Sequence, residues 1–326
     1  MTTSRRFAAK PVALFVLGFG RSGTSALTRV LSLCGAALPA GLLGATAENA
    51  RGYWEPRAAI HINQAILRRQ GSSGYDVTLR THKDGAFDAT ENAADIEKVK
   101  AFLTRLPTAP LVVIKEVKLT AVSGIWFEAA RLAGFDIAAV IAVRHPQEVI
   151  GSLAKRADRQ PYFPSSPELT GAGWLKYTLL AERDTRGVPR VFVDYANLME
   201  DWRREVKRIS AALAIDLSNQ DEGAVDEFLT PDLRHHRHGG AVPEPFGTDW
   251  MAVVYETLSA AARDEPWDES ALDRVFNAYR VSEHGFRTAF EDANRYLRAD
   301  RFMLPSLVKL ALEGLAIVHR RRGTWA

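Results

Sequence analysis

A glycine-rich segment at residues 18–25 carries the residue types that bind a phosphate or sulfate group. Its sequence, Gly-Phe-Gly-Arg-Ser-Gly-Thr-Ser, combines three glycines, three hydroxyl side chains and one arginine. An apolar run at residues 12–17 precedes it, and apolar residues at helical spacing follow it at residues 24–33. In such a strand–loop–helix turn, backbone N–H groups and the helix N-terminus converge on an anion. We therefore predict an anion site formed by Gly20, Arg21, Ser22, Gly23, Thr24 and Ser25.

The same loop departs from the GxxxxGK[ST] phosphate loop in its cation. Gly18 and Gly23 match the two glycines of that motif, but Thr24 stands at the lysine position and Arg21 supplies the positive charge. The motif's lysine reaches the β- and γ-phosphates of a nucleoside triphosphate, so its absence disfavours a magnesium-dependent NTPase. An arginine still suits a phosphate or a sulfate, because its guanidinium donates forked hydrogen bonds.

A second candidate anion-binding element follows another apolar run. Residues 137–143 lead directly into Arg144, His145 and Pro146, and the proline favours the start of a helix. Arg144 then stands at the carboxyl end of a strand, where open α/β sheets bind ligands, and Ser152 lies a little under two turns into the helix. Taken alone, the pair is explained as well by a surface arginine and a polar helix residue. Together with the first loop, Arg144 and Ser152 are predicted to bind a second anionic group.

The elements that must position these residues alternate along the chain. Apolar, strand-like runs occupy residues 12–17, 111–114, 137–143 and 191–193, and helical patterns between them occupy 24–33, 94–106, 122–132, 147–156 and 173–185. Strands that alternate with long helices indicate a parallel sheet covered on both faces, so we predict a three-layer α/β/α fold. Beyond residue 215 only helical patterns remain, at 224–229, 251–262, 271–279 and 304–319. We predict a flexible arm at 1–10, a core at 11–215 and a helical C-terminal extension at 216–326 packed on that core.

Composition and charge exclude several classes of protein. The 326 residues carry 42 Lys and Arg against 39 Asp and Glu, a net charge of +3 that is too small for a histone-like protein. No nucleic-acid partner is predicted, because the basic residues form short pairs without interleaved aromatic residues. No run approaches the ~18 apolar residues of a membrane span. The basic, then apolar N-terminus imitates a secretory signal but lacks a small-x-small cleavage site, so we predict a cytoplasmic protein. The single cysteine, Cys34, is predicted to be a buried thiol.

The two anion elements together resemble a known family. Residues 15–25, with Arg144-His145-Pro146 and the later Gly151-Ser152-Leu153, look like the sulfotransferases that use 3′-phosphoadenosine 5′-phosphosulfate (PAPS). The Arg-Ser-Gly-Thr loop is most similar to the bacterial branch and the tyrosylprotein type, and the resemblance covers residues 12–215. It implies a P-loop NTPase-like sulfotransferase fold. It also implies that Arg21 and the loop through Ser25 bind the 5′-phosphosulfate, and that Arg144 and Ser152 bind the 3′-phosphate.

The transfer of a sulfuryl group to a hydroxyl needs a base near the acceptor oxygen. The resemblance implies a catalytic glutamate between the first loop and the next helix, where Glu48 and Glu55 stand among aromatic residues that could line a sugar or phenol pocket. We rank Glu55 first and Glu48 second. The alternative for Glu55 is an acid placed before a helix that starts at Pro56, where the helix dipole favours negative charge.

Lys115 ends the strand-like run at 111–114 and is predicted to project from the carboxyl edge of the sheet. The resemblance implies that a lysine or arginine there faces the active site, so Lys115 joins Arg21 as a group that stabilises developing charge. The family pattern of Lys, an acid, Pro and Arg is not kept at Val117 and Lys118. The alternative is that Lys115 and Glu116 form an exposed ion pair, which contributes little to stability.

The most polar cluster of the chain lies at residues 234–240. Three histidines within four residues of one loop rarely converge on a metal ion, so no metal site is predicted. The resemblance implies a basic loop that closes over the nucleotide, with Arg234 as a further donor-binding residue. A solvated surface loop is the alternative.

The sequence thus predicts a PAPS-dependent sulfotransferase whose acceptor is a hydroxyl of a carbohydrate, glycolipid or small molecule. The enzymatic alternative is a P-loop kinase that uses ATP and magnesium, with residues 191–194 as its acidic strand. A nucleotide-binding scaffold without catalysis is a third hypothesis. The apolar stretch at 303–318, followed by a basic His-Arg-Arg-Arg, fits either a docked terminal helix or a peripheral contact with an anionic membrane. The oligomeric state is not predicted.

Overall fold

The computed structural model describes residues 10–45, 49, 51–82, 87–160, 165–230, 240–300, 310, 314 and 317. The chain divides into two compact units, Met1–Phe276 and Asn277–Ala326. The predicted boundaries near residues 10 and 215 stay predictions.

The first unit is built on a four-stranded parallel sheet. The strands β1 (Val12–Leu17), β2 (Leu111–Ile114), β3 (Asp136–Val143) and β4 (Arg190–Asp194) lie in the order β2-β1-β3-β4. The register places Val12 beside Leu111 on one side and beside Asp136 on the other. All four strands therefore end at the same edge of the sheet, and the segments that follow β1, β2, β3 and β4 meet there.

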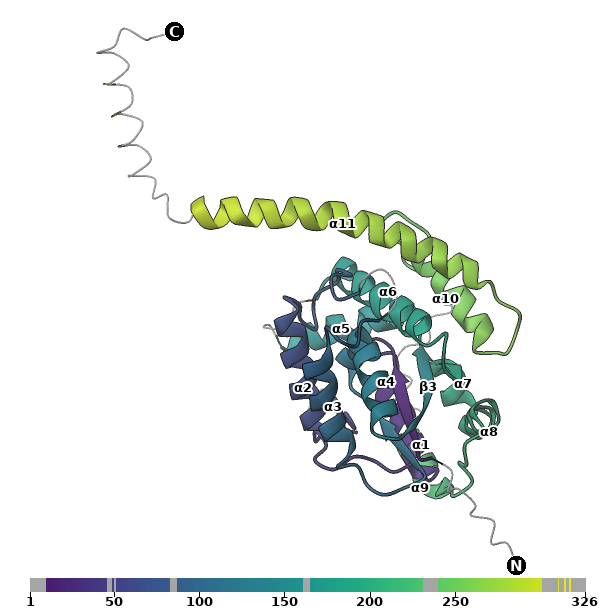
Figure 1. Ribbon diagram of the computed structural model, residues 1–326. Coiled ribbons are helices and arrows are strands. Elements are labelled where there is room, and N and C mark those ends of the chain that lie inside the picture. Colours follow the sequence, from purple (N-terminus) through teal and green to yellow (C-terminus); the bar gives the residue numbers. More distant parts are fainter. Residues whose placement is uncertain are drawn as a thin grey trace, which may run out of the picture. The chain divides into compact units, whose positions relative to one another are not determined.

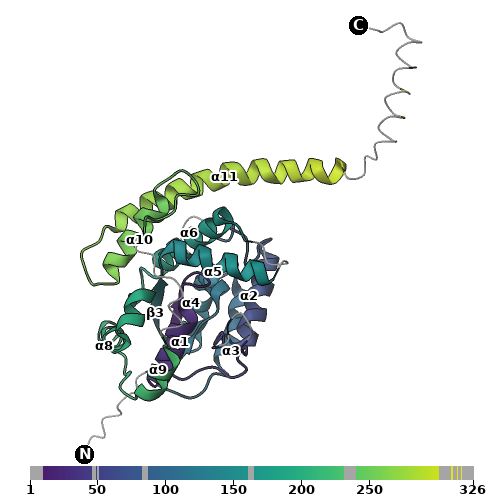
Figure 2. The same cartoon turned by 180° about the vertical axis from the view of Figure 1, so that it is seen from behind.

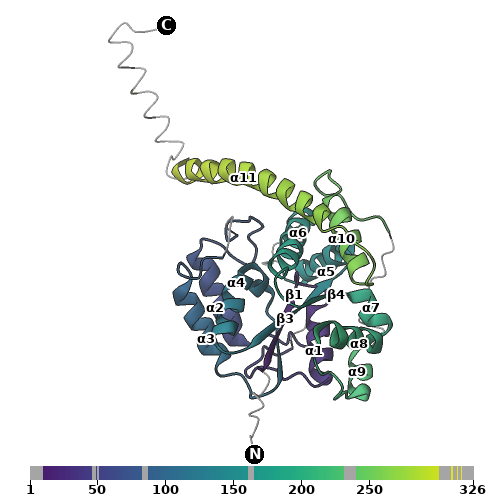
Figure 3. The same ribbon diagram turned by 45° about the vertical axis from the view of Figure 1, so that its right-hand side comes forward.

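Both faces of the sheet are covered, because side chains of successive strand residues point to opposite faces. Leu14 and Val16 pack in one core cluster with apolar residues of α1 (Thr24–Leu33) and α8 (Trp202–Leu213). Phe15, between them, contacts the rings of Trp126 and Phe127 in α4 (Ser123–Leu132). Figure 3 shows the strands between α2 (Arg57–Arg69), α3 (Ala93–Leu103) and α4 on one side and α1, α8 and α9 (Glu222–Phe228) on the other. The predicted three-layer α/β/α fold with a parallel sheet is confirmed.

Further helices stand near the carboxyl edge of the sheet. They are α5 (Pro146–Arg159), α6 (Pro167–Asp184), α7 (Tyr195–Glu200) and α10 (Trp250–Ala261). Figures 1 and 2 show α5 and α6 next to each other above the sheet. Pro146 is the first residue of α5, and Ser166 and Asp201 begin α6 and α8 with a side-chain oxygen that accepts a backbone N–H.

The predicted secondary structure needs correction at several helices. The helix predicted at 271–279 is α11 (Glu269–Asp300), and α2 was not among the predicted helical patterns. The helix expected from residue 122 is preceded by a 3-10 helix, η1 (Val117–Val122), so the chain turns helical directly after Lys115 and Glu116. Helix α6 begins six residues before the predicted start at 173, because Ser166 caps it and Pro167 opens it. Helices α7 and α8 lie in a segment for which no helical pattern was predicted. The side chains of Asp194 and Asp201 cap the N-termini of α7 and α8, and aspartate before a helix is a helix-start signal in the sequence.

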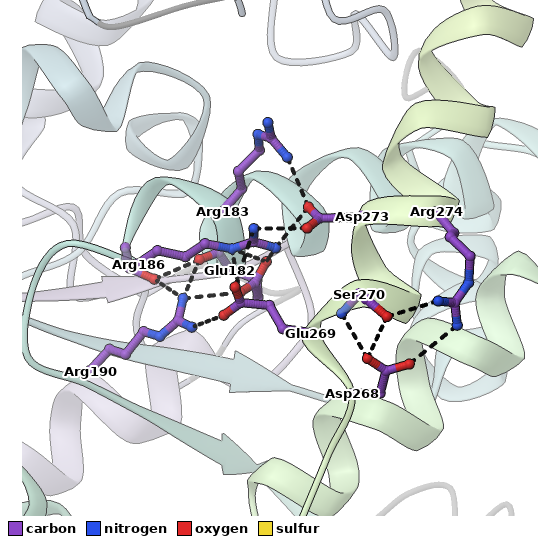
Figure 4. A network of polar contacts seen from close by, with 10 residues as sticks. Glu182, Arg183, Arg186, Arg190, Asp268, Glu269, Ser270, Asp273 and Arg274 are labelled. Atoms are coloured by element: carbon purple, nitrogen blue, oxygen red, sulfur yellow. Dashed lines mark hydrogen bonds and ion pairs between the residues drawn. The ribbon is translucent and has the colours of Figure 1, made fainter.

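A network of ion pairs joins the C-terminal half of α6 to β4 and to the first residues of α11 (Glu269–Asp300) (Figure 4). The buried Glu182 carboxylate accepts from Arg186, at 2.8 Å, and pairs with Arg190, at 3.1 Å. Arg186 also reaches Asp273, at 3.0 Å, and Arg190 reaches Glu269, at 3.2 Å. These acids hold the pKa of the Arg186 guanidinium above its usual range, chiefly through the hydrogen bonds to Glu182. The network ties two helices and a strand together at one place.

The second unit continues α11 from Asn277 onward. Within it, the described side chains of Val281 and Phe286 are exposed, as are those of Leu310 and Ile317. Leu310, Gly314 and Ile317 are helical. In the part of the chain that the structure describes, no helix combines the length and apolar character needed to cross a membrane.

Candidate functional site

The carboxyl ends of the strands open into a cavity of about 1220 Å³. It is lined by loop residues after β1, by the segment around Glu55, by Lys115 after β2, by Arg144 after β3, and by residues of α5 and α6. Most of the residues predicted for the site line it together: Gly20, Arg21, Gly23, Thr24, Ser25, Glu55, Lys115, Arg144 and Ser152. Segments 131 residues apart in the sequence therefore line one cavity.

The first loop is held in an unusual backbone conformation. Arg21 has φ of 70°, in the left-handed region that residues other than glycine rarely adopt. Gly23 has φ of 90°, and a Cβ at this position would enter the ring of Tyr195. The amide of Ser22 donates to the Phe19 carbonyl, at 3.2 Å, and Ser22 is buried and does not line the cavity. The loop closes on itself through Ser22, while Gly23 and Thr24 lead into α1.

The two predicted anion elements contact each other through Arg21. Its Nε donates to the Ser152 hydroxyl at 2.9 Å, and Nη1 of Arg144 donates to the Arg21 carbonyl, also at 2.9 Å. Arg144 stacks on the Tyr195 ring, 4.4 Å from its centroid, and pairs with Glu148 at 2.7 Å. Burial, together with the nearby Arg144 charge, lowers the pKa of the Arg21 guanidinium. Two cations held close together in a cavity, Arg144 buried and Arg21 partly buried, favour the binding of an anion between them.

A third group of residues surrounds Lys115, next to the loop after β1. Its Nζ donates to Glu55 Oε1 at 2.5 Å, to Ser25 Oγ at 3.1 Å and to the Tyr53 carbonyl at 3.2 Å. The Lys115 side chain is 2% exposed and that of Glu55 is 10% exposed. The site thus holds a carboxylate, an ammonium group and a hydroxyl next to the N-terminus of α1, an arrangement that can accept a proton and stabilise negative charge.

The alternative of an exposed pair between Lys115 and Glu116 is wrong. Both residues are buried, and Glu116 has partners of its own: Lys118 Nζ and Asn63 Nδ2, each at 2.6 Å. Burial raises the pKa of the Glu116 carboxyl, against the lowering effect of Lys118. The alternative role for Glu55 was that of an acid placed before a helix. The observed partner of its carboxylate is instead the Lys115 ammonium group. Helix α2 begins two residues later, at Arg57.

Two predicted residues fall outside the described part of the chain. They are Glu48 and Arg234, the latter with the rest of the histidine-containing cluster up to residue 239. In the described ranges, no group of three or more His, Cys, Asp or Glu side chains comes together as a metal site. Cys34 is buried as predicted, and burial raises the pKa of its thiol to about 11.

The acidic residue of the kinase alternative has other partners. Asp194, at the end of β4, accepts from the Ala196 amide at 2.9 Å and begins α7. Its second oxygen accepts from the hydroxyls of Ser259, at 3.1 Å, and Tyr255, at 3.3 Å. Burial raises the pKa of this carboxyl, and Asp194 does not line the cavity.

Two tyrosines that were not predicted as site residues, Tyr177 and Tyr195, also line the cavity. Tyr195 supports both Gly23 and Arg144. Tyr177, on α6, is buried, and its ring lies 5.5 Å from that of Phe19. The signal for Tyr195 was its position directly after a strand, next to the predicted Asp194. Tyr177 had no such signal, because helical spacing does not indicate whether a buried aromatic residue lies in the core or lines a cavity.

Comparisons with known proteins identify distant structural likenesses. No family model matches the chain, and no curated protein matches it. Among solved structures, it is similar to the sulfotransferase domain of the Synechococcus PCC 7002 olefin synthase, with a TM-score of 0.41 and 19% identity over 78% of this chain and 96% of that one. It is also similar to the sulfotransferase domain of the curacin biosynthetic pathway, with a TM-score of 0.43 and 13% identity over 80% of this chain and 100% of that one.

Proposed function

We propose that this protein is a sulfotransferase that moves a sulfuryl group from PAPS to a hydroxyl group of an acceptor. The observation that carries the proposal is the contact of Arg21 with both Ser152 and Arg144 in one cavity. A ligand that uses both elements needs two anionic groups a short distance apart. PAPS has these groups in its 5′-phosphosulfate and its 3′-phosphate.

Each half of the donor has its own residues in this proposal. The loop from Gly20 to Ser25, with the N-terminus of α1, binds the 5′-phosphosulfate through backbone N–H groups. Arg144 and Ser152 bind the 3′-phosphate, and Arg21 lies between the two sites. Tyr195 keeps Arg144 in place by stacking under its guanidinium.

Glu55 is the proposed base. It removes the proton of the acceptor hydroxyl while the acceptor oxygen forms a bond to sulfur. The bond between sulfur and the bridging oxygen of the 5′-phosphate breaks, and its electron pair stays on the departing adenosine 3′,5′-bisphosphate. Lys115 Nζ, within hydrogen-bond distance of Glu55 and Ser25, stabilises the negative charge on the transferred group and the leaving oxygen. No metal is required in this scheme.

The kinase alternative is not favoured. Thr24 replaces the phosphate-loop lysine, and the carboxylate of Asp194 caps a helix and binds two hydroxyls outside the cavity. A kinase of this loop type needs an acidic residue near its magnesium ion. The acceptor in our proposal is a carbohydrate, a glycolipid or another small hydroxyl compound. We further propose a cytoplasmic location, with peripheral membrane contact as an option for a lipid-linked acceptor.

Thermal unfolding with three ligands tests the proposal. The ligands are adenosine 3′,5′-bisphosphate, ADP, and ATP with magnesium, each with the wild type and with Arg21→Ala and Arg144→Ala. A ligand at ~100 times its dissociation constant adds about 2.7 kcal/mol to the free energy of unfolding. We expect stabilisation by the bisphosphate, reduced in both variants. Stabilisation by ATP with magnesium alone would reject the sulfotransferase and favour the kinase.

A further inference from the structure

The cavity is lined by many more cations than anions. Among its described lining residues, the acidic ones are Glu55, Asp76 and Glu116. The basic ones number nine: Arg21, Arg51, Arg68, Lys115, Lys118, Arg144, Lys155, Arg156 and Arg159. A cavity with such an excess of one sign concentrates ligands of the opposite sign.

Five of these cations either pair with residues near the proposed base, belong to the proposed donor site, or donate hydrogen bonds to residues at the end of α9. Lys115 pairs with Glu55, and Lys118 pairs with Glu116. Arg51 donates to the Glu227 carbonyl, at 3.1 Å, and to the Thr230 hydroxyl, at 2.7 Å, at the end of α9. Arg21 and Arg144 belong to the proposed donor site.

Exposure distinguishes three of the nine basic lining residues, Arg68, Lys155 and Arg159, and we call these three the rim. All three side chains are exposed. Lys155 and Arg159 follow Ser152 by three and seven residues, so they share its face of α5. At 1.5 Å per residue, Arg159 stands roughly 10 Å farther along the helix axis than Ser152. Arg68 belongs to the last turn of α2 and lines the same cavity.

Helix ends offer another explanation, because basic residues in a last turn are favoured by the helix dipole. Arg69 illustrates this ordinary role: it lies in the last turn of α2, pairs with Asp95, and does not line the cavity. The neighbouring Arg68 does line it. Two elements thus present cations to one cavity, and Arg159 lies farther from Ser152 than one phosphate group can span.

We propose that the rim of Arg68, Lys155 and Arg159 binds an anionic group of the acceptor, so that the substrate is a hydroxyl compound carrying a phosphate, carboxylate or sulfate. This inference rests on the proposed function, because it assigns Arg21, Arg144 and Ser152 to the donor. The acceptor's anionic group lies at the rim and its hydroxyl lies near Glu55.

The first test uses inorganic pyrophosphate as a probe on protein saturated with adenosine 3′,5′-bisphosphate. The rim variant is Lys155→Glu with Arg159→Glu, and Lys155→Gln with Arg159→Gln is a milder version should the first fail to fold. Arg156 is left unchanged, because its charge acts on Arg21. The matched control is Arg105→Glu with Lys207→Glu, which makes the same charge change at two exposed residues outside the cavity.

We expect pyrophosphate to raise the melting temperature of the saturated wild type and control further, and to bind the rim variants at least tenfold more weakly. The effect should shrink as salt is added, since the rim is exposed. No further rise in the wild type, or an equal rise in the rim variants, would overturn the proposal. A wild type that does not respond to the bisphosphate itself would instead remove the proposed function, and this extension with it.

The second test measures transfer from labelled PAPS to matched acceptors. Each pair consists of a neutral hydroxyl compound and its phosphorylated, carboxylated or sulfated counterpart, for example a hexose and its 6-phosphate. We expect turnover at least tenfold higher with the anionic member, a preference that the rim variant loses and the control keeps. Comparison of the three anions identifies the group that binds. Equal use of the neutral members by the wild type would contradict the proposal.

Discussion

The guanidinium of Arg21 donates a hydrogen bond to the hydroxyl of Ser152, 131 residues later in the chain, at 2.9 Å. The contact joins the loop after β1 to the helix after β3. Arg21 reaches it from a left-handed backbone conformation, which costs roughly 1–2 kcal/mol for a residue with a Cβ. Strain of this kind persists where surrounding contacts impose it, and it occurs often at binding sites.

Replacement of Ser152 by alanine tests the importance of this contact. We expect Ser152→Ala to weaken the binding of adenosine 3′,5′-bisphosphate about tenfold, which corresponds to about 1.4 kcal/mol. The variant loses both a proposed phosphate ligand and the hydroxyl that orients Arg21. Titration calorimetry measures the affinity, with Ser282→Ala, an exposed serine of α11, as the control. Unchanged affinity would remove Ser152 from the donor site.

The Glu55 carboxylate offers a test of the proposed chemistry. We expect Glu55→Gln to lower turnover at least a hundredfold, the usual range for loss of a general base, and to leave bisphosphate binding within a few-fold of the wild type. Transfer of label from PAPS measures the first quantity and calorimetry the second. Glu128→Gln, on α4 and not among the residues that line the cavity, serves as the control. A fully active Glu55→Gln variant would exclude Glu55 as the base.

Glu116 predicts a dependence of stability on pH. Burial raises the pKa of its carboxyl above the ordinary value of 4.5, so the folded protein binds this proton more tightly than the unfolded chain does. The resulting stabilisation is complete below the ordinary pKa and is lost as pH rises through the folded pKa. Relative to the wild type, Glu116→Gln should therefore be more stable at about pH 8 than at about pH 5.

Urea unfolding at the two pH values measures this difference. Glu97→Gln, whose side chain is 65% exposed, is the control for a neutralised carboxylate. A stability of Glu116→Gln, relative to the wild type, that is higher at about pH 5 than at about pH 8 would contradict this expectation.

Figure 4 shows two arginines, Arg186 and Arg274, that we expect to differ strongly in their contribution to stability. Arg186 binds the buried Glu182 through two nitrogens, whereas Arg274 binds Asp268 and is 68% exposed. Arg186→Ala should lower the free energy of unfolding by about 3 kcal/mol, because it leaves a buried carboxylate with fewer partners. Arg274→Ala should change it by less than about 1 kcal/mol. Chemical denaturation of both variants measures this, and equal losses would refute the distinction.

Local patterns determined much of this protein. The strands β1 and β2 and helix α1 lie at the predicted bounds, because a short apolar run between Pro11 and Gly18, or a helical stripe ending before Gly35, needs no distant information. The loop between β1 and α1 and the start of α5 at Pro146 were likewise visible in the sequence. Parallel strands share a carboxyl edge, so these predictions already brought Arg21 and Arg144 to one side of the sheet.

Tertiary structure alone decided which side chains meet at that edge. The pairing of Lys115 with Glu55 spans 60 residues. It depends on how the segment before α2 packs against α1, where the Ser25 hydroxyl donates to the Tyr53 carbonyl. From the sequence, Lys115 could either face the active site or pair with the adjacent Glu116. The sequence does not show in which direction each of these two side chains points. The positions of Tyr195, between Gly23 and Arg144, and of the rim cations around the cavity depend equally on packing. Spacing along the chain fixes which residues share a face of one element, but contacts between elements follow from how those faces pack.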